Sequence, residues 1–146
     1  MPHRAVITVI QNRQFLTTTP EKSVRAVAAH MRDNGDGAVL IVSPDSGKLL
    51  GICTERDLTF KVLAAGLDAD ATPIRSVMTA APQTISPDRP FAHALHLMYE
   101  GGFRHLPVVL DDGRPIGVLS ARDALGPEMS DFCQELEQRE ELAVIL

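Results

Sequence analysis

The chain has 146 residues, with 14 Lys and Arg against 19 Asp and Glu, a formal net charge of −5 at pH 7, and no tryptophan. This length corresponds to about one domain and is enough to bury a core without disulfides or metals. The acidic balance and the scarcity of aromatic side chains argue against nucleic-acid binding, which needs a basic face and aromatic stacking platforms. We therefore expect one compact unit without a nucleic-acid partner.

The apolar runs of the chain are short. AVLIV at 38–42 and LAVIL at 142–146 are far below the length that crosses a bilayer, and the N-terminus lacks the apolar core of a signal peptide. We expect a soluble, cytoplasmic protein with no membrane partner. Cys53 lies in an apolar strand, Cys133 lies in a predicted helix, and no CxxC motif is present, so two buried, reduced thiols are expected.

The sequence repeats itself. An offset of 67 aligns the first half with the second, and the offset falls to 66 after the turns SPDSGK and LDDGR. A change of one residue in a hairpin turn leaves the flanking elements equivalent. The aligned pairs are Ile7 with Ile74, Ile10 with Val77, Pro20 with Pro87, Met31 with Met98, Gly51 with Gly117, and Asp57 with Asp123. The chain is therefore predicted to contain two copies of one unit.

Each copy is predicted to begin with a short strand, LTTTP at 16–20 or QTISP at 83–87, followed at once by an amphipathic helix. The Thr or Ser before the proline is expected to cap that helix, and the proline to start it. In copy one the apolar positions include Val24, Val27 and Met31. Asn34-Gly35 and Gly101-Gly102 are expected to end the two helices.

Two apolar strands come next in each copy, joined by a tight turn, and we expect them to pair antiparallel. They are AVLIV at 38–42 with LLGIC at 49–53, and HLPVV at 105–109 with PIGVL at 115–119. A helix follows, over 54–65 in copy one and from 120 onward in copy two. Gly126-Pro127 interrupts the second of these, so a separate amphipathic helix is predicted over 128–141.

A unit of about 60 residues is marginal alone, so the two copies are expected to pack sheet against sheet as one α+β domain with pseudo-twofold symmetry. The predicted organisation is repeat 1 at 7–66, a linker with the first strand of copy two at 67–79, repeat 2 at 80–126, and a C-terminal helix and tail at 127–146.

The segments TERDL, SARDAL, FRHLPVV and SVMTAAPQTISPD together resemble tandem CBS domains, the paired repeat often called a Bateman module; the resemblance covers about residues 7 to 125. It implies two β-α-β-β-α repeats, clefts between them, frequent dimerisation, and binding of adenosine-containing ligands such as AMP, ADP, ATP, S-adenosylmethionine or NAD. In that family the hydroxyl and Asp of GxxTxRD hold the ligand. Those positions correspond here to Thr54 and Asp57, and to Ser120 and Asp123.

The same four residues also fit a capping box, in which the hydroxyl accepts from a backbone amide and the carboxylate reaches back. A ribose diol adds a different requirement, because a carboxylate can accept from both hydroxyls at once. The two interpretations are compatible, and the paired copies favour a ribose site that also caps a helix.

The remaining candidate residues are basic side chains for phosphate and apolar walls for adenine. Surface salt bridges are the alternative for the arginines, and core packing is the alternative for the walls. Copy one has Gly37 and Ala38 where copy two has a basic pair, so we expect one cleft to bind better than the other. The candidates are Arg56, Arg122, Arg104 and His105 for phosphate, and Thr18, Ala38, Ile85 and Pro107 for the walls.

No catalytic site is expected. His93 and His96 lie at helical spacing without further ligands for a metal, and neither a P-loop nor a dinucleotide GxGxxG is present. We expect a homodimeric, non-enzymatic module with no catalytic cofactor, in which an adenine nucleotide acts as a regulatory ligand and an unidentified protein responds to it. The alternatives are a scaffold or dimerisation module without nucleotide, and a binder of NAD or S-adenosylmethionine. The C-terminal segment is expected to pack on its own domain or on a dimer mate.

Overall fold

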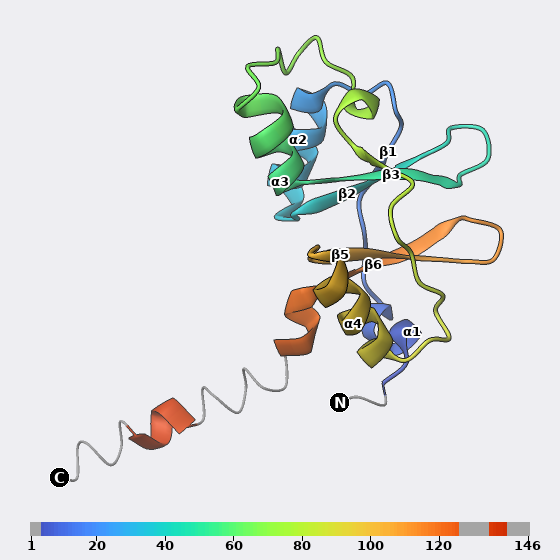
Figure 1. Ribbon diagram of the computed structural model, residues 1–146, viewed down its shortest axis with the longest axis vertical. Coiled ribbons are helices and arrows are strands. Elements are labelled where there is room, and N and C mark those ends of the chain that lie inside the picture. Colours follow the sequence, from blue (N-terminus) through green and yellow to red (C-terminus); the bar gives the residue numbers. More distant parts are fainter. Residues whose placement is uncertain (1–3, 126–134, 140–146) are drawn as a thin grey trace.

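The computed structural model describes residues 4–125 and 135–139, and it divides into two halves, each a sheet covered by helices (Figure 1). The predicted helix over 128–141 falls inside this range only at 135–139, which is helical. Cys133 lies outside the described residues. The two-copy α+β architecture predicted from the repeat is confirmed.

The first half contains a four-stranded sheet in the order β1-β2-β3-β4. β1 pairs parallel with β2, and β2–β3 and β3–β4 pair antiparallel. Two helices pack on this sheet: α2, and the helix that follows β3. The helix after β3 begins as α3 and continues as a π-helical segment, η1. The bounds are Thr17–Thr18 (β1), Val24–Asn34 (α2), Ala38–Val42 (β2), Leu49–Thr54 (β3), Glu55–Asp57 (α3), Leu58–Leu63 (η1) and Thr79–Ala80 (β4).

The second half contains the antiparallel pair β5–β6 with helix α4 against it. The predicted strand over 83–87 is reduced to one bridge, in which Ile85 pairs parallel with Val108. The bounds are Phe91–Gly101 (α4), His105–Val109 (β5), Pro115–Ser120 (β6) and Ala121–Ala124 (the 3-10 turn η3). The antiparallel hairpins predicted for both copies are thus confirmed.

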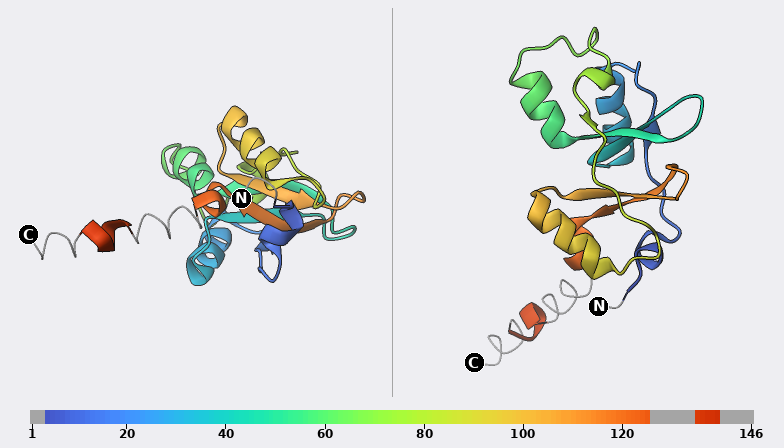
Figure 2. Two further views of the ribbon diagram at one scale, coloured as in Figure 1. Left: turned by 90° about the horizontal axis from the view of Figure 1, so that it is seen from below. Right: turned by 45° about the vertical axis from the view of Figure 1, so that its right-hand side comes forward.

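The two sheets face each other (Figure 2, right). Ala38, Leu40 and Ile52 form a small apolar cluster that Val118 of β6 packs against. A backbone hydrogen bond from Leu49 N to Gly113 O, 3.0 Å long, joins the two hairpins at their turns. The sheet-to-sheet packing therefore fixes how the ends of β3 and β6 approach one another.

The predicted helix starts at Pro20 and Pro87 are wrong. α2 begins at Val24 with Ser23 as its cap, whose hydroxyl accepts from Ala26 N at 3.1 Å. α4 begins at Phe91, after Pro90. Thr19 and Ser86 instead accept through their carbonyls in tight turns, from Lys22 N and Arg89 N. A proline tolerates either role, so Ser/Thr-Pro does not decide between a turn and a helix start.

Each half is completed by a segment from the other copy. α1 (Val6–Ile10) contributes Val6, Val9 and Ile10 to the core that contains Phe91 and Leu106. The equivalent segment of copy two, which includes the 3-10 turn η2 (Ile74–Ser76), contributes Ile74 and Val77 to the core formed by α2, β2 and β3. Figures 1 and 2 show α1 beside α4, far from the rest of copy one. The N-terminal segments of the two copies are exchanged.

Two aligned glycines allow these exchanged segments to approach. A Cβ on Gly117 would lie 2.9 Å from Ile10 Cδ1, and one on Gly51 would lie 2.5 Å from Met78 Sδ. Both distances are too short for a Cβ atom beside a non-bonded heavy atom, so the neighbouring segment would have to move. A larger residue at either position would push the exchanged segment away from its sheet.

Cys53 is fully buried on β3. Burial, and then the nearby Asp57 charge, raise the pKa of its thiol to about 12. The thiolate is the reactive form, so Cys53 is expected to resist iodoacetamide at pH 8 in the folded Cys133→Ser variant and to be alkylated fully in guanidinium. Mass spectrometry measures this directly. Rapid labelling of the folded variant would contradict it.

Candidate ligand-binding cleft

A cleft of about 1210 Å³ lies between the two halves. It is lined where β3 runs into α3 and where β6 runs into η3, the two places that carry the repeated motif. Of the twelve residues predicted for a nucleotide site, nine line this one cleft: Thr54, Arg56, Asp57, Ser120, Arg122, Asp123, Ala38, Arg104 and His105.

The other three predicted residues are not among those that line the cleft. Ile85 is 5% exposed and belongs to the core of the second half, and Pro107 of β5 is fully buried. They pair through a 3.0 Å hydrogen bond from Ile85 N to Pro107 O. Thr18 of β1 is half-buried beside β2, paired with Ile41. These residues support the sheets behind the cleft.

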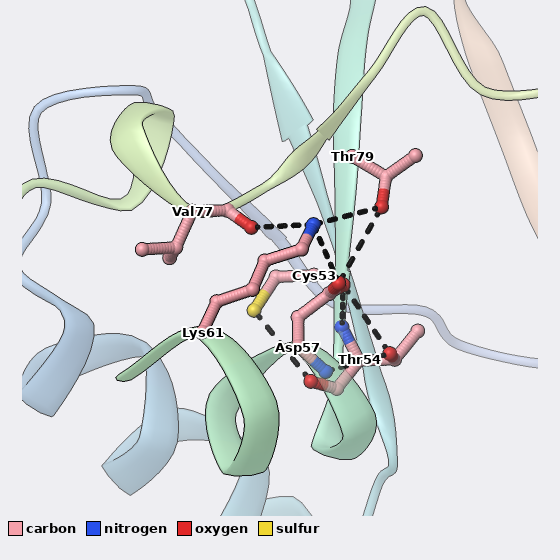
Figure 3. Close-up of polar contacts among 6 residues, drawn as sticks. All are labelled: Cys53, Thr54, Asp57, Lys61, Val77 and Thr79. Atoms are coloured by element: carbon pink, nitrogen blue, oxygen red, sulfur yellow. Dashed lines mark hydrogen bonds and ion pairs between the residues drawn. The ribbon is translucent and has the colours of Figure 1, made fainter. Parts of the chain in front are cut away.

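Asp57 is held by a dense set of donors (Figure 3). Its Oδ2 accepts from Thr54 N at 3.0 Å and from Thr54 Oγ1 at 3.3 Å. Its Oδ1 accepts from Thr79 Oγ1 at 3.4 Å and forms an ion pair with Lys61 Nζ at 2.9 Å. With Asp57 N donating back to Thr54 Oγ1 at 3.4 Å, the predicted capping box is present.

Asp123 occupies the equivalent place in copy two with fewer partners. Its Oδ2 accepts from Ser120 N at 2.8 Å, and its Oδ1 forms an ion pair with Arg13 at 2.7 Å. The Ser120 hydroxyl also accepts from Arg122 N at 3.3 Å. Ser120 and Asp123 form the second capping box. Arg4 donates to the Asp123 carbonyl at 3.3 Å and lies over the Phe91 ring.

His105 lies at the start of β5, opposite copy one. Its Nε2 is close to Gly37, beside the Glu55 carboxylate. Burial lowers the pKa of the imidazole from 6.5, and this outweighs the opposite effect of Asp36, Glu55 and Asp123. The lowered pKa favours the neutral imidazole, which can act as a hydrogen-bonding group toward a phosphate.

Arginines dominate the remaining polar lining. Arg56 stacks over Phe60 on its own helix, with the guanidinium carbon 5.0 Å from the ring centroid. Arg104 and Arg122 come from copy two and are exposed to the cleft. The lining contains five Lys or Arg residues and four Asp or Glu residues, so its charges are nearly balanced although the whole chain is acidic.

Three lining residues that touch the motif carboxylates were not predicted: Arg13, Lys61 and Thr79. Lys61 follows Asp57 by four residues on one helix, a spacing that favours an ion pair, so the sequence carried a signal for it. Arg13 and Thr79 follow the exchanged segments, and their approach to Asp123 and Asp57 depends on that exchange. No local sequence pattern indicates the exchange of segments.

Within residues 4–125 and 135–139, no three His, Cys, Asp or Glu side chains are grouped so as to hold a metal ion. None of the helices in that part of the chain combines the length and apolarity needed to cross a bilayer. His93 and His96 both lie on α4, where His96 pairs with Glu100 at 3.4 Å.

The family model for the CBS domain matches residues 7–64 and 74–126, so the chain belongs to the CBS domain family and carries two repeats. The second matched range begins at Ile74, in the segment that the structure packs into the first core.

Solved structures agree with this assignment. A CBS domain protein from Pyrobaculum aerophilum complexed with AMP has 26% identity and a TM-score of 0.76, covering 82% of this chain and 89% of that one. The CBS domain pair of protein MJ0100, in complex with 5′-methylthioadenosine and S-adenosyl-L-methionine, has 25% identity and a TM-score of 0.78, covering 89% of this chain and 99% of that one.

Among curated proteins, an uncharacterized protein of Methanopyrus kandleri is 34% identical over 119 residues, which is 82% of this chain. The chain spans 60% of that relative's length, and 19% of the length of a CBS domain-containing protein of Arabidopsis thaliana. Several relatives therefore carry much more than a CBS pair.

Proposed function

We propose that the chain is a non-catalytic regulatory module that binds an adenosine-containing nucleotide, AMP, ADP or ATP in preference to NAD or S-adenosylmethionine, in the cleft between its repeats. The observation that carries this proposal is that both copies of the repeated motif meet at one cleft, in which a motif carboxylate, Asp123, lies together with several arginines. Carboxylates recognise a ribose diol, and arginines recognise phosphate. The relatives solved with AMP, or with 5′-methylthioadenosine and S-adenosylmethionine, support this ligand class.

The proposed function includes regulation of a partner protein. The cleft is formed by both halves, so a ligand that contacts both stabilises one relative arrangement of the repeats. A partner protein that distinguishes this arrangement would read the nucleotide level. We propose that the module acts as a cytoplasmic homodimer, for which the exposed Phe60 and Leu63 on η1 offer an apolar surface.

Thermal unfolding tests the ligand class. AMP at one hundred times its Kd is expected to stabilise the fold by about 2.7 kcal/mol, seen as a rise in Tm. The matched control is 2′-deoxy-AMP, which keeps the base and phosphate but lacks the diol and is expected to give a much smaller rise. NAD, ATP and S-adenosylmethionine, measured in parallel, rank the ligands.

A scaffold module without nucleotide is the second candidate, and the two capping boxes favour it, since they give Thr54, Asp57, Ser120 and Asp123 a structural role without a ligand. It predicts no change of Tm with any adenosine compound, an outcome that would eliminate the nucleotide proposal.

A further inference from the structure

Resting on the proposed function, we propose that only the copy-two side of the cleft holds a ribose: Asp123 accepts the diol, whereas Lys61 fixes Asp57 as a structural anion, so that each chain binds one nucleotide. The two carboxylates make a matched comparison, because both side chains are 10% exposed and both belong to capping boxes. They differ in the donors that already surround them.

Asp57 has little acceptor capacity left for a diol. A carboxylate offers about four lone-pair positions. Two on Oδ2 are taken by the Thr54 amide and hydroxyl and one on Oδ1 by Thr79 Oγ1, and the Lys61 ammonium faces Oδ1 in an ion pair. A ribose at Asp57 would have to displace donors that the chain itself supplies.

Lys61 is locked in place by three acceptors. Besides Asp57 at 2.9 Å, its ammonium donates to Val77 O at 3.1 Å and Thr79 Oγ1 at 3.5 Å (Figure 3). An ammonium has three donors, and here it makes two hydrogen bonds and one ion pair. Moving Lys61 away costs the ion pair and leaves the nearly buried Asp57 charge without its cation.

Asp123 retains acceptor capacity. Within the described part of the chain, its Oδ2 accepts one hydrogen bond, from Ser120 N, and its Oδ1 forms an ion pair with Arg13. The acceptor positions that remain on the two oxygens suit the two adjacent hydroxyls of a ribose. At offset 66 the counterpart of Lys61 is Pro127, a residue type that carries no cation.

The hydroxyls follow the same pattern. The Thr54 hydroxyl donates to Asp57, whereas the Ser120 hydroxyl accepts from Arg122 N and, among described residues, donates to no protein group. Ser120 can thus donate to the sugar. Arg13 is 44% exposed and uses one nitrogen on Asp123, which leaves other guanidinium donors for a phosphate. Acceptor, donor and cation are all available on the copy-two side.

Calorimetric titration with AMP tests this asymmetry through two matched substitutions. The wild type is expected to bind one AMP per chain. Asp123→Asn is expected to weaken binding by about 100-fold or more, because one of the two acceptor oxygens becomes a donor and the other loses its charge. Asp57→Asn is expected to change Kd by less than about threefold, because no ligand bond is removed. The reverse ranking of the two variants, or two AMP molecules per wild-type chain, would overturn the inference.

Removing the blocking donors tests the role of Lys61. Lys61→Met/Thr79→Ala removes the hydrogen bond and the ion pair at Asp57 Oδ1 and is expected to raise the stoichiometry to two AMP per chain. Lys61→Arg keeps a cation and is expected to stay at one. A stoichiometry of one in the folded double variant, verified by thermal unfolding, would overturn the blocking role; if that variant unfolds, the Asp→Asn pair decides. Absence of AMP binding to the wild type would instead remove the proposed function itself.

Discussion

Replacing Val6, Val9 and Ile10 together by alanine is expected to lower the free energy of unfolding by about 5 kcal/mol, which is comparable to the total stability of many domains. These side chains are 0%, 7% and 5% exposed, and they complete the core of the second half although they stand at the N-terminal end of copy one in sequence. Equilibrium unfolding in urea, followed by circular dichroism, measures the loss.

Ile7→Ala is the matched control, because Ile7 lies on the same helix but is 46% exposed. Its expected effect is below about 0.5 kcal/mol. Equal, small losses for the triple variant and the control would show that α1 is not part of the second core.

Asp57→Ala is expected to cost about 2–3 kcal/mol, because it leaves the Thr54 amide without its acceptor and Lys61 without its partner. The cost falls below that of a fully buried pair because the Lys61 side chain is 44% exposed. Asp57→Asn keeps an acceptor for the amide and is expected to cost less. Denaturant unfolding without nucleotide gives both values.

The control for a surface pair is Asp112→Ala, which breaks the exposed contact between Asp112 and Arg114. Exposed ion pairs contribute about 0–1 kcal/mol, so little change is expected there. If Asp57→Ala were as mild as Asp112→Ala, the structural role assigned to Asp57 would fail.

Much of the fold could be predicted because its signals are local. The strands at Ala38–Val42 and His105–Val109 are continuous apolar runs, and the glycines that end α2 and α4 adopt the left-handed conformation expected there, with φ of 63° at Gly35 and 71° at Gly102. The first residues of the helices could not be predicted from local signals in the same way. Ser23, rather than Thr19, caps α2, and the choice depends on tertiary pairing such as the hydrogen bond from Val24 N to Thr72 O.

The motif residues of the cleft could be predicted from the repeat, but their partners could not. Thr54 and Asp57 are marked by sequence order, and so are Ser120 and Asp123. Arg13 and Thr79 reach those carboxylates only because segments 67 residues apart exchange halves, and short apolar segments such as Val6–Ile10 do not reveal which core receives them. The repeat alignment pairs Ile7 with Ile74 but does not indicate that each segment packs in the half formed by the other copy.

The exchange of segments also connects the cleft to both cores. In the N-terminal segment, Ile10 packs in the second core and Leu16 packs in the first. Arg13, which lies between them in sequence, forms an ion pair with Asp123 in the cleft. The contact of Arg13 with Asp123 is therefore made by a segment that both cores hold, so the occupancy of the cleft and the packing of the two halves are linked through one short stretch of chain.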